Sequence, residues 1–139
     1  MILIKKLKVC IVVSIYNKEI TYKSLNLAKL FLKKYKITKI DIVKAPGAFE
    51  IPVIISRLIK RYDAFVAIGC VIKGETNNFD LISKAITNGI MNLSINHNKP
   101  IGNALITVFN KSQALKRTIK GQTAAKAVVE VLLNEPKKT

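Results

Sequence analysis

The stretch AFVAIGCVIKGETNNFD, residues 64–80, changes character twice within a short length. It opens with an unbroken run of apolar or small residues, 64–72, and then passes through a polar loop, 73–78. From Phe79 onward the apolar residues recur at helical spacing. A strand that is apolar on both faces is typical of a parallel sheet covered by helices on both sides. The segment therefore predicts a buried parallel strand, a polar loop at its carboxyl end and a following helix.

Similar apolar runs occur at intervals along the chain, separated by longer segments with helical periodicity. The runs predict strands over Val9–Ser14, Ile40–Lys44, Ala64–Ile72 and Ala104–Val108. The helices expected are a stripe over 25–32 ending near Tyr35, one over 53–59 with Pro52 in its first turn, one over 79–93, a short piece over Gln113–Arg117, and a closing helix over Ala124–Leu133. This alternation predicts an α/β protein, a three-layer αβα sandwich on a mainly four-stranded parallel sheet with right-handed crossovers.

Length and composition predict one domain over residues 1–139, because 139 residues with 50% hydrophobic content can bury a real core. The apolar stretches are broken before the roughly 18 to 20 residues that a membrane span needs, and MILIKKLKVC is not the pattern of a signal peptide. Cys10 and Cys70 lie inside apolar runs, which favours small buried hydrophobes over a disulfide or a metal pair. A reduced, cytoplasmic setting is expected.

The net charge of +16 raises the question of a polyanionic partner. The basic residues are nearly all lysines scattered through the chain, and only Arg57, Arg61 and Arg117 are arginines. Proteins that bind nucleic acids usually rely on arginine forks and exposed aromatic side chains, and neither is enriched in this sequence. Nucleic acid is therefore the least favoured of the partners considered.

Parallel sheets bind ligands beyond the carboxyl ends of their strands, so the polar segments that follow the runs are the expected site. These segments are 14–17, 45–50 and 73–78. Tyr16 can stack on a flat heterocycle, and Glu50 can accept hydrogen bonds from sugar-like hydroxyls. Gly47 is expected to permit a tight turn, with Phe49 at the mouth of the sheet. Each feature also has an ordinary structural explanation, since an aromatic at such an edge is usually part of the core.

The loop 73–78 has the composition of an anion site. Gly74 would let a ligand approach the backbone closely, and the free amides at the start of the helix, with the hydroxyl of Thr76, would attract a phosphate. Glu75 would then have to direct its carboxylate away. The alternative is that Asn77 or Asn78 simply caps the helix, and the two interpretations are compatible.

These stretches together resemble the successive motifs of one family, lumazine synthase. The motifs are SIYNKEI (14–20), APGAFEIP (45–52), GCVIKGETNNFD (69–80), PIGNALITVFNKSQALKR (100–117) and KGQTAAKA (120–127). The resemblance implies a flavodoxin-like sandwich assembled as pentamers or multiples of pentamers, with active sites between subunits. It also implies the condensation of 5-amino-6-(D-ribitylamino)uracil with 3,4-dihydroxy-2-butanone 4-phosphate to 6,7-dimethyl-8-ribityllumazine, phosphate and water, with no organic cofactor and no metal.

The resemblance also assigns roles to particular residues of this chain. Tyr16 matches an aromatic that stacks on the pyrimidine; Ala48, Phe49 and Glu50 match the ribityl-binding segment; Val71 and Ile72 match backbone contacts to the ring; Gly74, Glu75 and Thr76 match the phosphate loop; Asn103 matches a position that closes the site from a neighbouring subunit; and Arg117 matches the arginine that pairs with the phosphate.

The chain departs from the family pattern at the residue before Phe79, where Asn78 replaces a histidine to which a proton-shuttling role is assigned. An amide does not titrate near neutral pH, so a slowed enzyme is expected, with Asn78 and Arg117 as its catalytic positions. The only histidine, His97, is expected to be a solvated turn residue, while Asp80 is a candidate for orienting Asn78 or a water molecule. The alternative reading is a catalytically decayed homologue that binds flavin or lumazine, or forms shells.

A second departure follows Arg117, where the chain reaches the matched pair Lys120 and Gly121 about five residues sooner than the family pattern. The place of Lys120 in the structure is therefore open. Ala104 also stands where the family commonly has glycine, which would narrow the approach beside Asn103.

Overall fold

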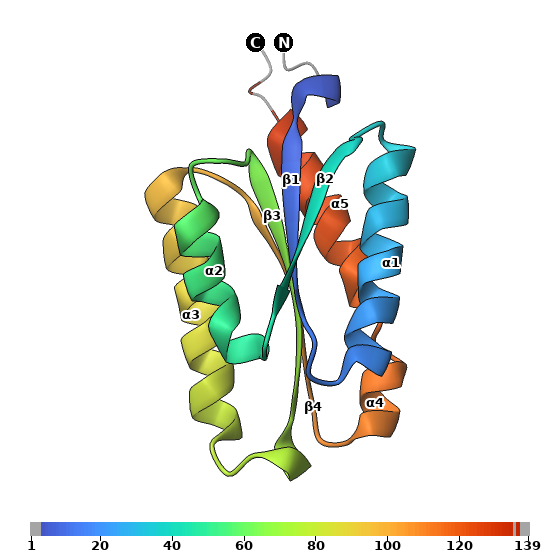
Figure 1. Ribbon diagram of the computed structural model, residues 1–139, viewed down its shortest axis with the longest axis vertical. Coiled ribbons are helices and arrows are strands. Elements are labelled where there is room, and N and C mark those ends of the chain that lie inside the picture. The colour runs from blue at the N-terminus through green and yellow to red at the C-terminus, as the bar shows by residue number, and fades with distance from the viewer. Residues whose placement is uncertain (1–3, 135, 137–139) are drawn as a thin grey trace.

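The computed structural model describes residues 4–134 and 136 of the chain. These residues form a four-stranded parallel sheet with helices on both faces (Figure 1). The strands are β1 (Lys8–Ser14), β2 (Lys39–Ala45), β3 (Ala64–Ile72) and β4 (Ile101–Val108). The helices are α1 (Lys18–Lys34), α2 (Ile51–Leu58), α3 (Phe79–His97), α4 (Lys111–Leu115) and α5 (Lys120–Leu133), with short 3-10 turns η1 (Ile4–Lys6), η2 (Ala48–Glu50) and η3 (Lys73–Glu75). The predicted α/β class and parallel sheet are confirmed.

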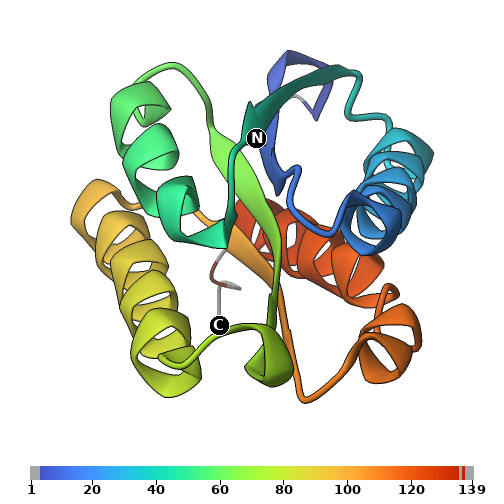
Figure 2. The same cartoon turned by 60° about the horizontal axis from the view of Figure 1, so that its bottom comes forward.

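The strand order is β2-β1-β3-β4, so β1 and β3 are the central strands. Helices α1, α4 and α5 lie on one side of the sheet, and α2 and α3 lie on the other (Figure 2). The first layer buries residues such as Val9 and Val66 against α1 and α5, and the second buries Val12 and Phe65 against α2 and α3. The bounds of β3 are those predicted, because both of its faces are fully covered.

The expectation that every strand is covered on both faces is wrong for β2. Among its residues only Ala45 is buried, and Ile42 is exposed. The reason is position, because β2 is an edge strand and the helices lie over the central pair.

The first residues of β4 also differ from the prediction. The strand begins at Ile101, because Gly102 and Asn103, which are weak strand formers, pair with Val66 and Ala67 of β3. Asn103 is therefore part of an edge strand rather than of a loop.

Helix α4 begins at Lys111 and ends at Leu115, two residues earlier at each end than predicted. Asn110 accepts a hydrogen bond at Oδ1 from the backbone N–H of Gln113 (3.0 Å), and Gln113 Oε1 accepts one from the N–H of Phe109 (2.8 Å). This is a variant of the reciprocal capping pattern, and its signal, an asparagine three residues before a glutamine, was present in the sequence. Arg117 consequently lies beyond the helix, in the turn 116–119 that leads to α5.

Helix α5 also begins earlier than predicted, at Lys120 instead of Ala124, and it packs closely on its neighbours through two glycines. A Cβ at Gly102 would lie 2.6 Å from the carbonyl oxygen of Ala124, and a Cβ at Gly121 would collide with the backbone of Ser24. Only a residue without a side chain fits at either point, so these glycines set how near α5 lies to β4 and α1.

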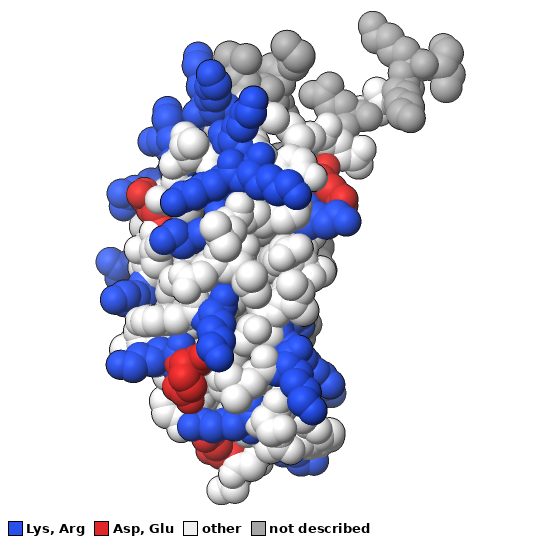
Figure 3. Space-filling view, turned by 90° about the vertical axis from the view of Figure 1, so that its right-hand side faces the viewer, with Lys and Arg blue, Asp and Glu red and all other residues white. Residues whose placement is uncertain are grey.

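Within the described residues, no helix combines the length and apolarity needed to cross a membrane. On the face that carries α1 and α4, lysine and arginine side chains are distributed from one end to the other with uncharged surface between them (Figure 3).

Candidate functional site

A cleft of about 160 Å³ lies at the carboxyl ends of the strands, the lower end of the sheet in Figure 1. It is formed by the ends of β1 and β3, the turns η2 and η3, and the first turn of α3. The residues that line it are Tyr16, Gly47, Ala48, Phe49, Glu50, Cys70, Val71, Ile72, Glu75, Thr76 and Ile82. Eight of the predicted substrate-binding residues are thus brought together around one hollow: Tyr16, Ala48, Phe49, Glu50, Val71, Ile72, Glu75 and Thr76.

The floor of the cleft depends on Gly69, which sequence reasoning did not single out. A Cβ at Gly69 would lie 2.9 Å from the Cβ of Ala48 and 3.0 Å from Cδ1 of Ile51. Real side chains do not tolerate such distances, so η2 can rest on β3 only because position 69 has no side chain. The available signal was a lone glycine inside an apolar strand, which often marks the close approach of another segment.

Two aromatic side chains stand at the cleft with much of their surface open to solvent. Tyr16 is 59% exposed and Phe49 is 61% exposed, although both line the hollow. Backbone hydrogen bonds from Ile15 to Ala45 (2.8 Å) and from Tyr16 to Pro46 (3.3 Å) hold the ends of β1 and β2 side by side. Exposed aromatic rings on a backbone held by hydrogen bonds can stack on a flat ligand with little loss of conformational entropy.

A tight turn does begin at Gly47, where the carbonyl oxygen accepts a hydrogen bond from the N–H of Glu50 at 3.3 Å, but the turn does not need the conformational freedom of glycine. The backbone of Gly47 is extended, with φ −146° and ψ 177°, a conformation that any residue adopts. A Cβ at Gly47 would instead lie 3.2 Å from Oε1 of Glu50. The glycine therefore leaves room for the Glu50 carboxylate at the cleft, which keeps that acceptor available to a ligand.

The carboxylate of Glu75 is turned toward the start of α1. Its Oε1 accepts a hydrogen bond at 3.2 Å from Nδ2 of Asn17, a residue in the left-handed conformation (φ 61°) at the N-cap of that helix. This is the orientation that an anion site in the loop requires, because an unengaged carboxylate would repel a phosphate.

Asn78 occupies the N-cap position of α3, but its side chain makes no capping hydrogen bond. Its backbone N–H donates to Oγ1 of Thr76 at 3.3 Å, and its carbonyl accepts from the N–H of Ile82 at 2.9 Å. The interpretation of Asn78 as a simple helix cap is therefore wrong. Its exposed amide is left available, and the first N–H groups of α3 have no side-chain acceptor at the N-cap.

Gly74 does not line the cleft, and the fold itself makes no steric demand for glycine there. A Cβ would lie 3.5 Å from the carbonyl oxygen of Phe109, an ordinary contact. The neighbouring Lys73 places its Nζ 5.3 Å from the centre of the Phe109 ring, a cation–π distance. This contact holds the loop 73–78 near the end of β4.

Besides Gly74 and Asn78, which lie in the adjoining loop 73–78, two predicted site residues lie outside this cleft on other parts of the fold. Asn103 pairs with Ala67, four positions before Val71, which places it about 13 Å back along the strand. Arg117 follows α4, whose Ala114 packs with Ile20 of α1 on the face opposite α3. The chain does not bring either residue to its own cleft.

The position of Lys120, open from the sequence, is at the outer edge of β4. Its Nζ donates a hydrogen bond to the carbonyl oxygen of Leu105 at 2.6 Å. Burial lowers the pKa of this ammonium group, and the nearby charge of Arg117 lowers it further.

Among the described residues, the two cysteines and His97 are not placed or poised to relay protons at the cleft. Cys10 and Cys70 are free and buried, as predicted, and burial raises the pKa of their thiols to about 12 and about 11. His97 is the exposed last residue of α3, so some 19 residues of helix place it about 28 Å from Asn78. Asp80 is exposed in the first turn of the same helix.

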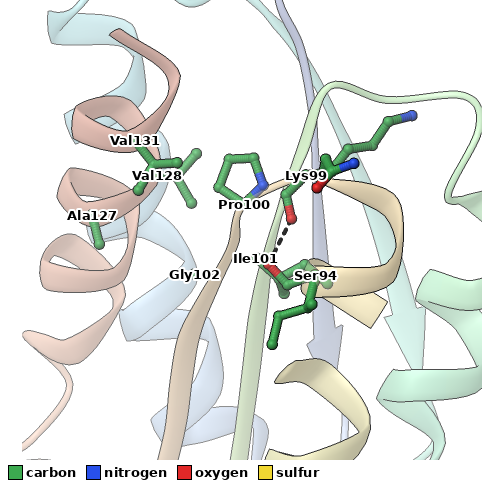
Figure 4. Close-up of a pocket in the computed structure, with 10 residues that line it drawn as sticks. Ser94, Lys99, Pro100, Ile101, Gly102, Ala127, Val128 and Val131 are labelled. Carbon is green, nitrogen blue, oxygen red and sulfur yellow. Dashed lines mark hydrogen bonds between the residues drawn. The ribbon is translucent and has the colours of Figure 1, made fainter. Parts of the chain in front are cut away.

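A second hollow, of about 420 Å³, lies at the opposite end of the sheet between α3, β4 and α5 (Figure 4). Pro100, Ile101, Val128 and Val131 give it mainly apolar walls, and Ser94 Oγ donates a 2.7 Å hydrogen bond to the carbonyl oxygen of Lys99 at its rim. It contains none of the predicted site residues and lies at the amino end of β4. The smaller cleft is the better candidate, because parallel sheets bind ligands at the carboxyl edge.

The fold and the cleft place this chain among the parallel α/β proteins that bind small molecules at the carboxyl edge of the sheet. The sequence model of one family, described as 6,7-dimethyl-8-ribityllumazine synthase, matches residues 6–135. The chain therefore belongs to the 6,7-dimethyl-8-ribityllumazine synthase family.

Relatives with that name come from distant organisms. The protein of Albidiferax ferrireducens is 38% identical over 132 residues, covering 91% of this chain and 84% of the relative. That of Limosilactobacillus reuteri is 33% identical over 136 residues, covering 93% and 90%. The protein of Thermococcus gammatolerans is 33% identical over 133 residues, covering 91% and 86%. The similarity thus extends through almost the whole of both chains.

Proposed function

We propose that this protein is a cytoplasmic transferase of riboflavin biosynthesis. It condenses 5-amino-6-(D-ribitylamino)uracil with 3,4-dihydroxy-2-butanone 4-phosphate to form 6,7-dimethyl-8-ribityllumazine, phosphate and water. The observation that carries the proposal is the match of residues 6–135 to the synthase family, combined with a cleft where its substrate-binding segments meet. Two free, buried thiols agree with a reducing compartment.

The pyrimidine substrate is assigned to the cleft of one subunit. Tyr16 stacks on its ring, and the backbone of Val71 and Ile72 meets the ring edge. The side chain of Ile72 belongs to the apolar cluster on the α1 and α4 face, which fits a role limited to its backbone. Ala48, Phe49 and Glu50 hold the ribityl chain, with the Glu50 carboxylate accepting hydrogen bonds from its hydroxyls.

The phosphate of the second substrate is assigned to the loop 73–78. Gly74 and Thr76 would bring it to the first amides of α3, which have no side-chain acceptor at the N-cap. Glu75 keeps its negative charge, but its hydrogen bond with Asn17 directs the carboxylate toward the start of α1.

A neighbouring subunit is proposed to complete the site. A cleft of about 160 Å³ is smaller than the roughly 300 Å³ at which small-molecule pockets usually begin. Asn103 and Arg117, the two assigned residues outside both the cleft and the loop 73–78, lie on the side of the molecule formed by β4 and the turn after α4. In a pentamer, or a multiple of pentamers, this side of one chain would cover the cleft of the next, and Arg117 would pair with the phosphate.

The chemistry needs little from side chains beyond orientation. An amine attacks the ketone, phosphate leaves and a second amine closes the ring, and holding both substrates in place accelerates these steps. Asn78 lies where the family pattern has a proton-relaying histidine, and an amide does not take up and release a proton near neutral pH. The expected enzyme is therefore competent but slow.

The direct test is the purified protein with both substrates. The appearance of lumazine fluorescence above the uncatalysed background supports the proposal. If neither the natural protein nor Asn78→His exceeds the background, the enzymatic claim is lost.

Asn78 also favours a second candidate, a decayed homologue that binds flavin or lumazine without turnover or serves as a shell protein. Tight binding of 6,7-dimethyl-8-ribityllumazine, with no rate in the same preparation, would identify this alternative.

A further inference from the structure

Two side chains form hydrogen bonds with the backbone of one residue, Leu105, at the free edge of β4. Because β4 is the last strand of the sheet, one side of its backbone has no strand partner. The N–H of Leu105 donates to Oδ1 of Asn103 at 2.9 Å, and the carbonyl oxygen of Leu105 accepts from Nζ of Lys120 at 2.6 Å. The backbone N–H and carbonyl oxygen of Leu105 are therefore both satisfied within the chain, although its side chain is buried in the core. A strand from another molecule cannot pair at this point without displacing the two side chains.

The same lysine is bonded through its backbone to the turn that carries Arg117. The N–H of Lys120 donates to the carbonyl oxygen of Arg117 at 3.0 Å, and the N–H of Arg117 donates to the carbonyl oxygen of Ala114 at 3.0 Å. A continuous path of hydrogen bonds thus runs from the end of α4, through Arg117 and Lys120, to the edge of β4. Only the four residues of the turn 116–119 separate α4 from α5, so the path is short.

We propose that Lys120 is a positioning residue, which holds the Arg117 turn against β4 through the carbonyl of Leu105 so that the guanidinium faces the phosphate of a neighbouring site. The inference rests on the proposed function, since it takes Arg117 as the phosphate partner. Lys120 acts through Arg117 and does not itself contact the substrate. Its half-buried ammonium group is already engaged by Leu105, and desolvation leaves it less able to keep a proton.

Leu105 thereby anchors two assigned residues at once. Asn103 uses its amide oxygen to accept from Leu105, so its amide nitrogen is the group directed outward. Lys120 bonds to the carbonyl oxygen of the same residue, which belongs to the next peptide group. Leu105 on β4 therefore links Asn103 to the start of α5, which follows the Arg117 turn.

The test compares Lys120→Met, which keeps the length of the side chain but removes the donor, with Lys116→Met. Lys116 is an exposed lysine on the same turn, so its loss removes the same charge without removing the link to Leu105. We expect Lys120→Met to raise the KM for the butanone phosphate, and the inhibition constant of inorganic phosphate, about tenfold. The KM for the pyrimidine should stay within about twofold. Lys120→Arg, which retains donors, should recover part of the loss.

A double-mutant cycle separates positioning from direct contact. In an Arg117→Met background, Lys120→Met should cause no further change in the Tm shift produced by inorganic phosphate, because the residue being positioned is gone. A further, additive loss would mean that Lys120 meets the phosphate itself and would overturn the proposal. Equal behaviour of Lys120→Met and Lys116→Met would also overturn it.

Binding of inorganic phosphate, measured as the shift in Tm of each folded variant, gives a second readout that does not need turnover. We expect natural protein and Lys116→Met to show the same shift, and Lys120→Met a smaller one. If the natural protein shows no turnover while the three proteins show the expected Tm shifts, the proposed reaction is rejected but the positioning role is not. An active natural protein whose phosphate shift is unchanged by Lys120→Met would reject the positioning role alone. If Lys120→Met does not fold, the same comparison is made with Lys120→Arg and Lys120→Gln, and an undiminished shift in the glutamine variant overturns the proposal.

Discussion

Asn78 stands at the start of α3 with an exposed side chain that supports neither the helix nor the loop. A substitution there should change chemistry without disturbing the fold. Tyr62 is the opposite case, because its ring is buried and its hydroxyl bonds to Oδ2 of Asp41 at 2.6 Å. At the scale of single residues, the chain thus separates positions that act on the reaction from positions that act on stability.

Asn78→His should raise kcat by about a hundredfold, the lower range for a positioned general acid or base. The value of kcat should also become dependent on pH near the pKa of an imidazole. Asn77→His is the matched control, since Asn77 is the adjacent exposed asparagine. Initial rates of lumazine fluorescence across pH measure both effects. An equal increase in kcat for Asn78→His and Asn77→His would contradict the prediction.

Tyr62→Phe should alter alkaline stability in a defined window. The hydrogen bond to Asp41, followed by burial, raises the pKa of Tyr62 from 10.0 to about 12. Between these values the unfolded chain has lost the phenolic proton and the folded chain keeps it, so the free energy of unfolding falls as pH rises. Below pH 10 the contribution is complete.

Tyr62→Phe should therefore lower the free energy of unfolding by about 1 kcal/mol at neutral pH and flatten its fall between pH 10 and 12. Urea denaturation at successive pH values measures both effects. Tyr35→Phe, which removes an exposed hydroxyl, should leave the slope in this window as it is in the natural protein. An unchanged slope in Tyr62→Phe would contradict the assignment.

At the scale of elements, glycines decide how closely the helical segments approach the sheet. Gly69 lets η2 rest on β3, while Gly102 and Gly121 let α5 rest on β4 and α1. The cleft thus owes its shape in part to the missing side chain at Gly69, which is remote in sequence from the segment η2 that rests on it. Such contacts tolerate no added methyl group, because the facing atoms are mainly backbone or buried side chains.

Gly69→Ala should displace η2 and lower the free energy of unfolding by about 1–3 kcal/mol, the usual range for overpacking. Affinity for the lumazine product should fall with it, since Ala48, Phe49 and Glu50 are the residues of η2. Gly74→Ala is the stability control, and it should leave the free energy unchanged or raise it by up to about 1 kcal/mol. Equal stabilities for the two variants, by urea denaturation, would rule out the close contact as the cause.

The whole molecule presents one part of the assigned site in and beside its cleft and another part, Asn103 and Arg117, near the edge formed by β4. Phe49 belongs to the first part and Arg117 to the second, and the two lie on different parts of the surface. No single chain can use both on one substrate pair without a large rearrangement. The assembly is therefore expected to be part of the active site.

Subunit mixing provides the test at this scale. Phe49→Ala and Arg117→Met should each be nearly inactive alone, while a one-to-one mixed assembly should regain about a quarter of the natural activity, since random neighbours form that share of complete sites. Native mass measured on the same samples should show an oligomer. Absence of recovery in a verified mixed oligomer would show that each chain builds its own site.

Much of the candidate site could be predicted because its residues follow the strands in short, contiguous segments. Tyr16, the segment 48–50 and the end of β3 were all placed correctly at one edge of a parallel sheet. The capping interpretation of Asn78 failed, because whether an amide bonds to its own helix depends on a side-chain rotamer. The role of Gly69 was missed because it depends on η2, which is distant in sequence.

By itself, the sequence determined the order of strands and helices, the parallel sheet, and the family to which the chain belongs. These follow from the periodicity of apolar residues and from contiguous motifs, which are local properties of the chain. Only the tertiary structure decided that β2 is exposed, that Arg117 lies away from its own cleft, and that Lys120 bonds to Leu105. Those facts depend on which distant segments pack together, and packing is decided by the fit of the whole molecule.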